Sequence, residues 1–177
     1  MNKKDFPTPN FNTFAKEIIK EAFIITETEA VNFFKESFFK QGFTDTSFQE
    51  WEDRKLPDYR PGGAILQDSG ILRDSIERAS KTSNSITIGS YAQHAKIHNE
   101  GGIISLPVTK KMRKYFWAMY QETKNEKWKY MALTKKNNLV IKMPKRQFMG
   151  NSAALMRLLD TKLKRHTLER FKNISTN

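Results

Sequence analysis

Residues 26–42 read TETEAVNFFKESFFKQG, and this stretch decides how the chain begins to fold. Four apolar residues recur at spacings of three and four, which places them on one face of a helix: Ala30, Phe33, Phe34 and Phe38. Thr26 and Glu29 match a capping box, in which each side chain bonds an exposed backbone N–H of the first turn. Gly42 suits the left-handed residue that ends such a helix. We therefore expect a helix over residues 27–41 with an aromatic face.

A second amphipathic segment precedes this helix. Its apolar residues also keep helical spacing and predict a helix over residues 13–25: Phe14, Ile18, Ala22 and Ile25. Residues 1–12 contain two Pro and several Asn and are expected to form an extended N-terminal arm. We expect the two helices to pack on a sheet through Phe14, Ile18, Phe34 and Phe38.

The rest of the chain alternates short elements with turns. We expect a short helix after Asp68 and Ser69, strands at 85–90, 95–98 and 103–108, a helix at 110–120, and a hairpin of strands 128–133 and 139–143. From Ser152 onward, leucines at every fourth position among lysines and arginines predict a final basic helix. The predicted fold is α+β: N-terminal helices packed on an antiparallel β-sheet, with a C-terminal basic helix. One domain spans residues 13–172, and 173–177 form a flexible tail.

Composition limits the classes of protein to consider. Hydrophobic residues make up 38% and aromatic residues 12% of the 177 residues, which is enough for a packed core. The absence of Cys excludes disulfides, thiolate metal sites and cysteine nucleophiles. No apolar stretch follows the first lysines and none is long enough to span a bilayer, so we expect neither a secretory signal nor a membrane anchor.

The net charge of +12 is unevenly distributed along the chain. Residues 1–102 hold 13 basic and 15 acidic residues, a net charge of −2, whereas residues 103–177 hold 18 and 4, a net charge of +14. This asymmetry indicates that one side of the molecule meets an anionic partner: nucleic acid, a membrane surface or an acidic protein face. An ordinary solvated basic surface explains the charge alone equally well.

The sequence offers few candidates for catalysis or metal binding. His94 and His98 are four residues apart, and on a helix both imidazoles could reach one metal. The segment is instead predicted as a strand, in which the two Cα atoms would lie about 13 Å apart. No phosphate-binding loop, dinucleotide fingerprint or nucleophile elbow occurs. We therefore expect no catalytic residue, no metal and no cofactor.

Residues 110–117, KKMRKYFW, are the strongest candidate for contact with nucleic acid. Their cations can contact phosphates, and exposed aromatic side chains can stack on bases. The favoured alternative is structural, because Met112, Phe116 and Met119 have the spacing of a helix face that packs on a core.

Four segments, preceded by an aromatic-rich helix and Trp51, resemble in order the motifs of one known family. They are ILQDSGILRDSI (65–76), TIGS (87–90), AKIHNEGG (95–102) and MPKRQFMG (143–150). The family is the virion-morphogenesis, or tail-completion, family of tailed phages and Mu-like prophages. The resemblance covers roughly residues 30–155. It departs from the family pattern at His94, which stands in place of a Tyr, and in the insertion-like stretch 110–138.

The matching positions are interpreted as structural. They are Asp68, Ser69, Gly70, Leu72, Ser75, His98, Gly101, Gly102, Pro144, Arg146, Phe148 and Gly150. Asp68 to Gly70 provide a helix cap and a turn, Gly101 and Gly102 permit positive φ, and Pro144 ends a strand. Arg146 and Phe148 are expected to anchor the turn that follows.

The resemblance implies a non-enzymatic protein of the virion, made in the bacterial cytoplasm, that acts at the head–tail neck or the tail end. It implies a homo-oligomeric ring whose faces dock on other neck or tail proteins, with no membrane. Six cations are expected to face such a partner or, non-specifically, DNA: Lys110, Lys111, Arg113, Lys114, Lys145 and Arg146. The alternative is a basic nucleic-acid-binding module that works alone.

Overall fold

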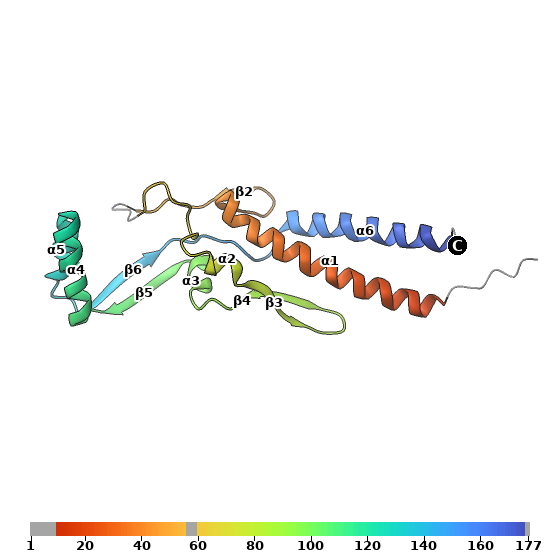
Figure 1. The fold of residues 1–177 in the computed structure, drawn as a ribbon, viewed down its shortest axis with the longest axis horizontal. Coiled ribbons are helices and arrows are strands. Elements are labelled where there is room, and N and C mark those ends of the chain that lie inside the picture. Colours follow the sequence, from red (N-terminus) through yellow and green to blue (C-terminus); the bar gives the residue numbers. More distant parts are fainter. Residues whose placement is uncertain (1–9, 56–59, 176–177) are drawn as a thin grey trace, which may run out of the picture.

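The computed structural model describes residues 10–55 and 60–175, which extend along one long axis (Figure 1). Helices α1 (Phe11–Lys40) and α6 (Ala153–Ser175) lie side by side at one end. At the other end, strands β5 (Gly102–Pro107) and β6 (Asn138–Met143) carry the helix pair α4 (Lys110–Thr123) and α5 (Glu126–Ala132). The middle holds β1 (Gly42–Thr44), β2 (Phe48–Glu50), α2 (Ile71–Asp74), β3 (Ile76–Lys81), β4 (Ile86–Ser90) and α3 (Ala95–Glu100).

The two N-terminal helices expected from the sequence form one helix, α1, of 30 residues. Asn10 caps it by accepting a hydrogen bond from the Thr13 N–H at 3.2 Å. The predicted break at Thr26 is wrong, because no Pro or Gly occurs between residues 11 and 40 and the Glu29 carboxylate pairs with Lys162 instead. Residues 1–9 of the expected arm lie outside the described residues. The expected flexible tail is helical as far as Ser175.

The end of α1 also differs from the expectation. Gln41, rather than Gly42, adopts the left-handed conformation, with φ of 58°. Its side chain accepts a hydrogen bond from the Ile65 N–H at 2.5 Å, which ties the turn to the following loop. Gly42 is needed for another reason: a Cβ there would lie 2.4 Å from the Gln49 carbonyl oxygen across the β1–β2 hairpin.

The strands form three separate two-stranded antiparallel sheets, β1–β2, β3–β4 and β5–β6, instead of one sheet. The strands expected at 85–90, 103–108 and 139–143 are confirmed, but the last two pair with each other. Residues 95–98 and 128–133 were predicted as strands, and both predictions are wrong, because these residues lie largely in α3 and α5. Asn125 caps α5 by accepting from the Lys127 N–H at 3.0 Å, and α5 packs on α4.

Acidic residues of α1 face basic residues of α6. Glu29 pairs with Lys162, Glu21 with His166 at 2.7 Å, and Glu17 with Arg170 at 2.9 Å. Along α6 these partners follow at four-residue steps, whereas on α1 Glu29 and Glu21 are eight residues apart and Glu21 and Glu17 are four apart. Beyond this ladder, Phe14 packs edge-on against Phe171 of α6, with ring centroids 5.1 Å apart. The expected packing of Phe14 on a sheet is therefore wrong.

The core lies where α1 and the start of α6 meet the middle segments. Phe38 and Phe148 are fully buried, with ring centroids 5.1 Å apart, and Trp51 packs edge-on against Phe38. Phe34 is 6% exposed, which confirms that this part of the predicted aromatic face is core. The α+β class is confirmed, with helix-on-helix packing in place of helices on a single sheet.

Candidate functional site

The four motif segments converge around residues 143–150. Pro144 directly follows the last residue of β6, as expected. The chain then passes α3 and Trp51 before Ser152 opens α6 by accepting from the Leu155 N–H at 3.0 Å. Because residues from four parts of the sequence meet here, this segment joins the β5–β6 ribbon to the α1–α6 pair.

Arg146 is buried in this junction, with 7% of its surface exposed. Its guanidinium donates two hydrogen bonds to the Glu52 carbonyl, at 2.9 and 2.8 Å, and a third to the Asp53 carbonyl at 3.1 Å. Burial is the main cause that lowers the pKa of this guanidinium below its ordinary value. The anchoring role is supported, and Arg146 does not face a partner or DNA as one of the six surface cations was expected to.

Two further side chains hold the same loop. The Asn99 side-chain oxygen accepts from the backbone N–H groups of Phe148 and Met149, at 2.9 and 3.0 Å. The Trp51 indole N–H donates to the Gln147 carbonyl at 2.7 Å. Sequence reasoning did not single out Asn99, although it stands inside the motif at 95–102, and only the fold brings it to residue 148.

The cap expected at Asp68 and Ser69 is wrong, because the N-cap of α2 is Gly70, which makes no side-chain cap hydrogen bond. Gly70 has φ of 78° and is the residue before α2, while the Ser69 hydroxyl accepts from the Ile71 N–H at 3.5 Å. Ser75 is fully buried and bonds the Leu72 carbonyl at 2.7 Å and the Ser90 hydroxyl at 2.6 Å. Ser75 thereby connects two of the motif segments.

Gly101 and Gly102 have φ of 73° and 144°, which confirms the expected positive values. They join helix α3 to strand β5 instead of joining two strands. A Cβ on Gly101 would lie 2.9 Å from the backbone nitrogen of Lys145. Glycine is therefore required here both by conformation and by the close approach of the two segments. Gly150 also has a positive φ, of 138°.

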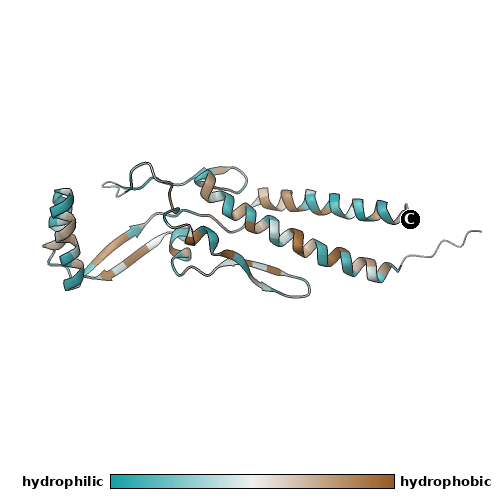
Figure 2. Cartoon of the chain, viewed as in Figure 1, coloured by the Kyte–Doolittle hydropathy of each residue, from teal (hydrophilic) through white to brown (hydrophobic). Residues whose placement is uncertain are grey.

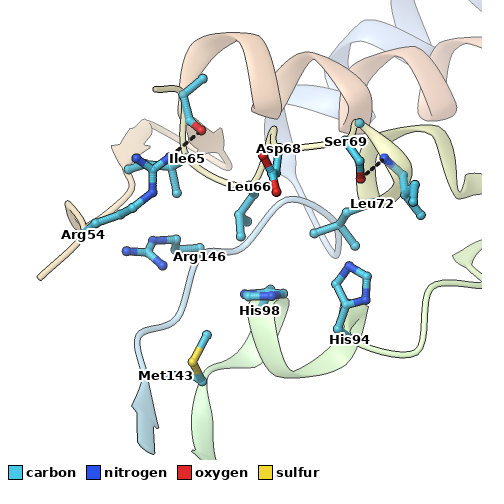
Figure 3. A pocket seen from close by; sticks show the side chains of 13 residues that line it. Arg54, Ile65, Leu66, Asp68, Ser69, Leu72, His94, His98, Met143 and Arg146 are labelled. Atoms are coloured by element: carbon cyan, nitrogen blue, oxygen red, sulfur yellow. Dashed lines mark hydrogen bonds between the residues drawn. The ribbon is translucent and has the colours of Figure 1, made fainter. Parts of the chain in front are cut away.

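A pocket of about 300 Å³ lies between the Asp68–Leu72 turn and α3 (Figure 3). His94 and His98 line the pocket together with Arg54 and Arg146. The ring centroids of the two histidines are 5.6 Å apart. The predicted strand spacing of these histidines is wrong because α3 is a helix. Burial, followed by the positive charges of His94 and Arg146, lowers the pKa of His98. Among the described residues, no cluster of three or more His, Asp or Glu side chains is placed to hold a metal.

The remaining expected surface cations lie in two places. Lys110, Lys111 and Lys114 are exposed on α4, and Lys145 is exposed beside the junction. Arg113 is half-buried and donates to the Ala132 carbonyl at 2.7 Å, so it holds α4 against α5. The structure thus brings four of the six cations together at the far tip of the molecule, and three of these are exposed.

The α4–α5 tip has a small core of its own. Phe116 is 4% exposed and stacks on Trp128, with ring centroids 5.9 Å apart. Met112 and Met119 are half-buried, which confirms the structural interpretation of this face. Tyr115 and Tyr130 remain 54% and 71% exposed, so the tip also presents aromatic side chains among its lysines.

Comparison with known proteins identifies the group to which these motifs belong. A model of the phage virion morphogenesis family matches residues 45–167, which is most of the chain. The chain belongs to this family. The match includes the junction, the β5–β6 ribbon and the α4–α5 tip. No curated protein and no solved structure matches the chain.

The family assignment agrees with the virion-morphogenesis resemblance seen in the sequence. Partners of this family member are expected among other virion proteins. No helix within the described ranges is long and apolar enough to cross a membrane.

Proposed function

We propose that this family member is a non-enzymatic component of the virion that completes the tail or joins it to the head. Copies close into a ring through head-to-tail contacts, and the basic tip docks on a neighbouring virion protein. The observation that carries this proposal is the projection formed by residues 102–143. Figure 1 shows it extending away from the α1–α6 pair, with α4 and α5 packed mainly on each other.

The charge distribution supports a docking role for the projection. In α6, Lys162, His166 and Arg170 are paired with acidic residues of α1. Residues 102–143, in contrast, hold ten Lys and Arg against two Glu, a net charge of +8. This excess positive charge attracts an acidic protein face, and at a Debye length of about 8 Å it acts only at short range.

The motif residues support a structural rather than a catalytic function. Arg146, Asn99 and Trp51 direct their polar groups to backbone atoms of the chain, at distances of 2.7 to 3.1 Å. These bonds fix the junction from which the projection extends, so they set the direction in which the tip is presented.

Deletion of the gene in a producing phage or prophage tests this function. Electron microscopy of the lysate is expected to show unjoined heads and tails, or tails with unfinished ends, and a plasmid copy is expected to restore complete particles. Complete, infectious particles in the absence of the protein would contradict the proposal.

The second candidate function is that of a nucleic-acid-binding module, and the surface of the α4–α5 tip is the observation that favours it. Exposed Tyr115, Trp117 and Tyr130 lie among lysines, which is the combination that stacks on bases and contacts phosphates. An affinity of the isolated protein for DNA that falls steeply with salt would favour this function over docking on protein. Fluorescence anisotropy with a labelled oligonucleotide measures it directly.

A further inference from the structure

Hydrophobic residues recur along both strands of the β5–β6 ribbon (Figure 2), and several of their side chains are exposed. Ile103 and Val140 are each 69% exposed, although they lie on different strands of the same ribbon. On the opposite face, the register pairs Ile104 with Ile141 and Leu106 with Leu139, so that face is wholly apolar over these four positions. A two-stranded ribbon is only marginally stable in water, which indicates that this one gains further strands or cover when assembled.

The β3–β4 and β5–β6 ribbons each have one strand with charged residues and one strand without. β3 carries Glu77, Arg78 and Lys81, and β6 carries Lys142, whereas β4 and β5 contain no charged residue. Charges on an edge strand oppose pairing with another strand, and an uncharged edge invites it. Across the described residues, β4 pairs only with β3 and β5 only with β6, so both uncharged strands keep one open edge.

β4 borders a groove of about 690 Å³ whose lining is partly apolar. Its apolar lining includes Ile86 and Ile88 of β4 with Phe34, Met149 and Leu155, and its polar lining includes Lys96, Asn99 and Glu100. Its lining residues come from α1, β4, α3 and the start of α6, and its apolar part can receive apolar side chains from an extended segment.

We propose that β5 of one copy pairs with the open edge of β4 in the next copy. This inference rests on the proposed ring. The result is an intermolecular sheet in the order β3–β4–β5–β6, in which the charged strands lie outermost and the uncharged ones are covered. The lengths match, since β4 has five residues and β5 has six. Apolar side chains of β5 enter the groove beside β4.

A β4–β5 contact between copies is favoured over a two-fold contact between the β5 strands of two copies. A β5–β5 pair would leave the β4 edge and its groove uncovered, whereas one β4–β5 contact covers both uncharged edges. The β4–β5 contact is also heterologous, because it joins two different surfaces. Contacts of this kind generate a ring when the rotation closes.

A matched pair of substitutions tests the edge contact. Ile103→Glu places a charge on β5 opposite Lys142, where a cross-strand ion pair helps to keep the ribbon folded. Val140→Glu places the same charge at an equally exposed site on β6. Thr87→Glu places a charge at an exposed position of β4, the other strand of the proposed contact. Sedimentation velocity of the full chain is expected to show assembly for the wild type and for Val140→Glu. Monomers are expected for Ile103→Glu and for Thr87→Glu. A monomeric wild type, or equal effects of Ile103→Glu and Val140→Glu, would overturn the proposal, and circular dichroism checks folding.

Cysteine crosslinking identifies the strands in contact, because the chain has no native Cys. Thr87→Cys and Ser105→Cys lie at exposed positions of β4 and β5. With a short bis-maleimide, which tolerates a small shift in register, a crosslinked dimer is expected only when the two variants are mixed. A dimer from Ser105→Cys alone would instead indicate the β5–β5 contact. If the mixed variants assemble but give no crosslinked dimer, the β4–β5 contact is excluded.

The same crosslink in purified particles separates this inference from the proposed function. Protein that is present in particles but gives no β4–β5 crosslink would contradict the inference and leave the function standing. Complete particles without the protein would contradict the function, whatever the crosslink in solution shows.

Discussion

The guanidinium of Arg146 donates two hydrogen bonds to the backbone carbonyl of Glu52, at 2.9 and 2.8 Å, although the two residues are 94 positions apart. This contact joins the loop that follows the projection to the segment that follows β2. Arg146 is buried, so these hydrogen bonds replace those that its charged guanidinium would make with water.

Replacing Arg146 by Ala should therefore destabilise the fold. We expect a loss of about 2–3 kcal/mol in the free energy of unfolding, because three hydrogen bonds from a charged donor are lost. Lys145→Ala, at the exposed neighbouring position, should change it by no more than about 0.5 kcal/mol. Urea denaturation measures both, and equal stabilities for the two variants would show that the contact to Glu52 is unimportant.

Phe34 provides a second test of the core. Phe34→Ala should cost about 3–5 kcal/mol, since the ring is buried and its removal leaves a cavity. Phe39→Ala removes the same group from a site on the same helix that is 67% exposed, and its cost should stay below about 1 kcal/mol. If both variants have the wild-type denaturation midpoint, this face of α1 is not core.

Long periodic patterns and alternating short runs both led to confirmed elements. α4 and α6 were expected near their observed bounds, because their apolar residues repeat over several turns. α3 and α5 were predicted as strands because short apolar runs do not distinguish the two structures. For α5, a signal was present: Asn125 followed by Glu126 is typical of a helix N-terminus.

The junction could be predicted only in part. Gly101, Gly102 and Pro144 have roles that follow from local geometry, and their motifs indicated those roles. The contacts of Arg146 with Glu52 and of Asn99 with Phe148 depend on segments distant in the sequence, so no local pattern predicts them. The ion pairs between α1 and α6 also join residues distant in the sequence, although the four-residue steps from Lys162 to His166 to Arg170 are visible within α6.

The half-buried His98 predicts a dependence of stability on pH. Its pKa is lowered in the folded state, so at mildly acidic pH the unfolded chain binds a proton that the folded chain does not. The free energy of unfolding should therefore fall as pH drops from about 6.5, the ordinary His value, through the lowered folded value. Above that window both states are neutral, and His98 contributes no pH dependence.

His98→Gln should flatten this part of the profile, because glutamine does not titrate. Denaturation at a series of pH values compares it with His94→Gln, which changes the exposed partner in the histidine pair. An unaltered slope in His98→Gln would show that His98 does not cause the acid sensitivity.

The exposed lysines of α4 test the docking role of the tip. Reversing Lys110, Lys111 and Lys114 to Glu should preserve folding and self-association, since these side chains are exposed and lie outside the β4–β5 contact. Incorporation into particles should be abolished, because an acidic partner surface would be repelled. A control with the same change of charge reverses Lys16, Lys20 and Arg157, which are exposed on α1 and α6. A folded tip variant that no longer self-associates would place the tip in the ring contact itself.

The position of the protein in purified particles tests the central claim most directly. Ser83→Cys, at the exposed tip of the β3–β4 hairpin and far from the projection, accepts a maleimide-linked gold label in this chain without other cysteines. Electron microscopy is expected to show the label at the head–tail neck or at the end of the tail, in several copies per particle. Particles that are complete and infectious but carry no label, although the labelled protein supports their production, would contradict a structural role in the virion.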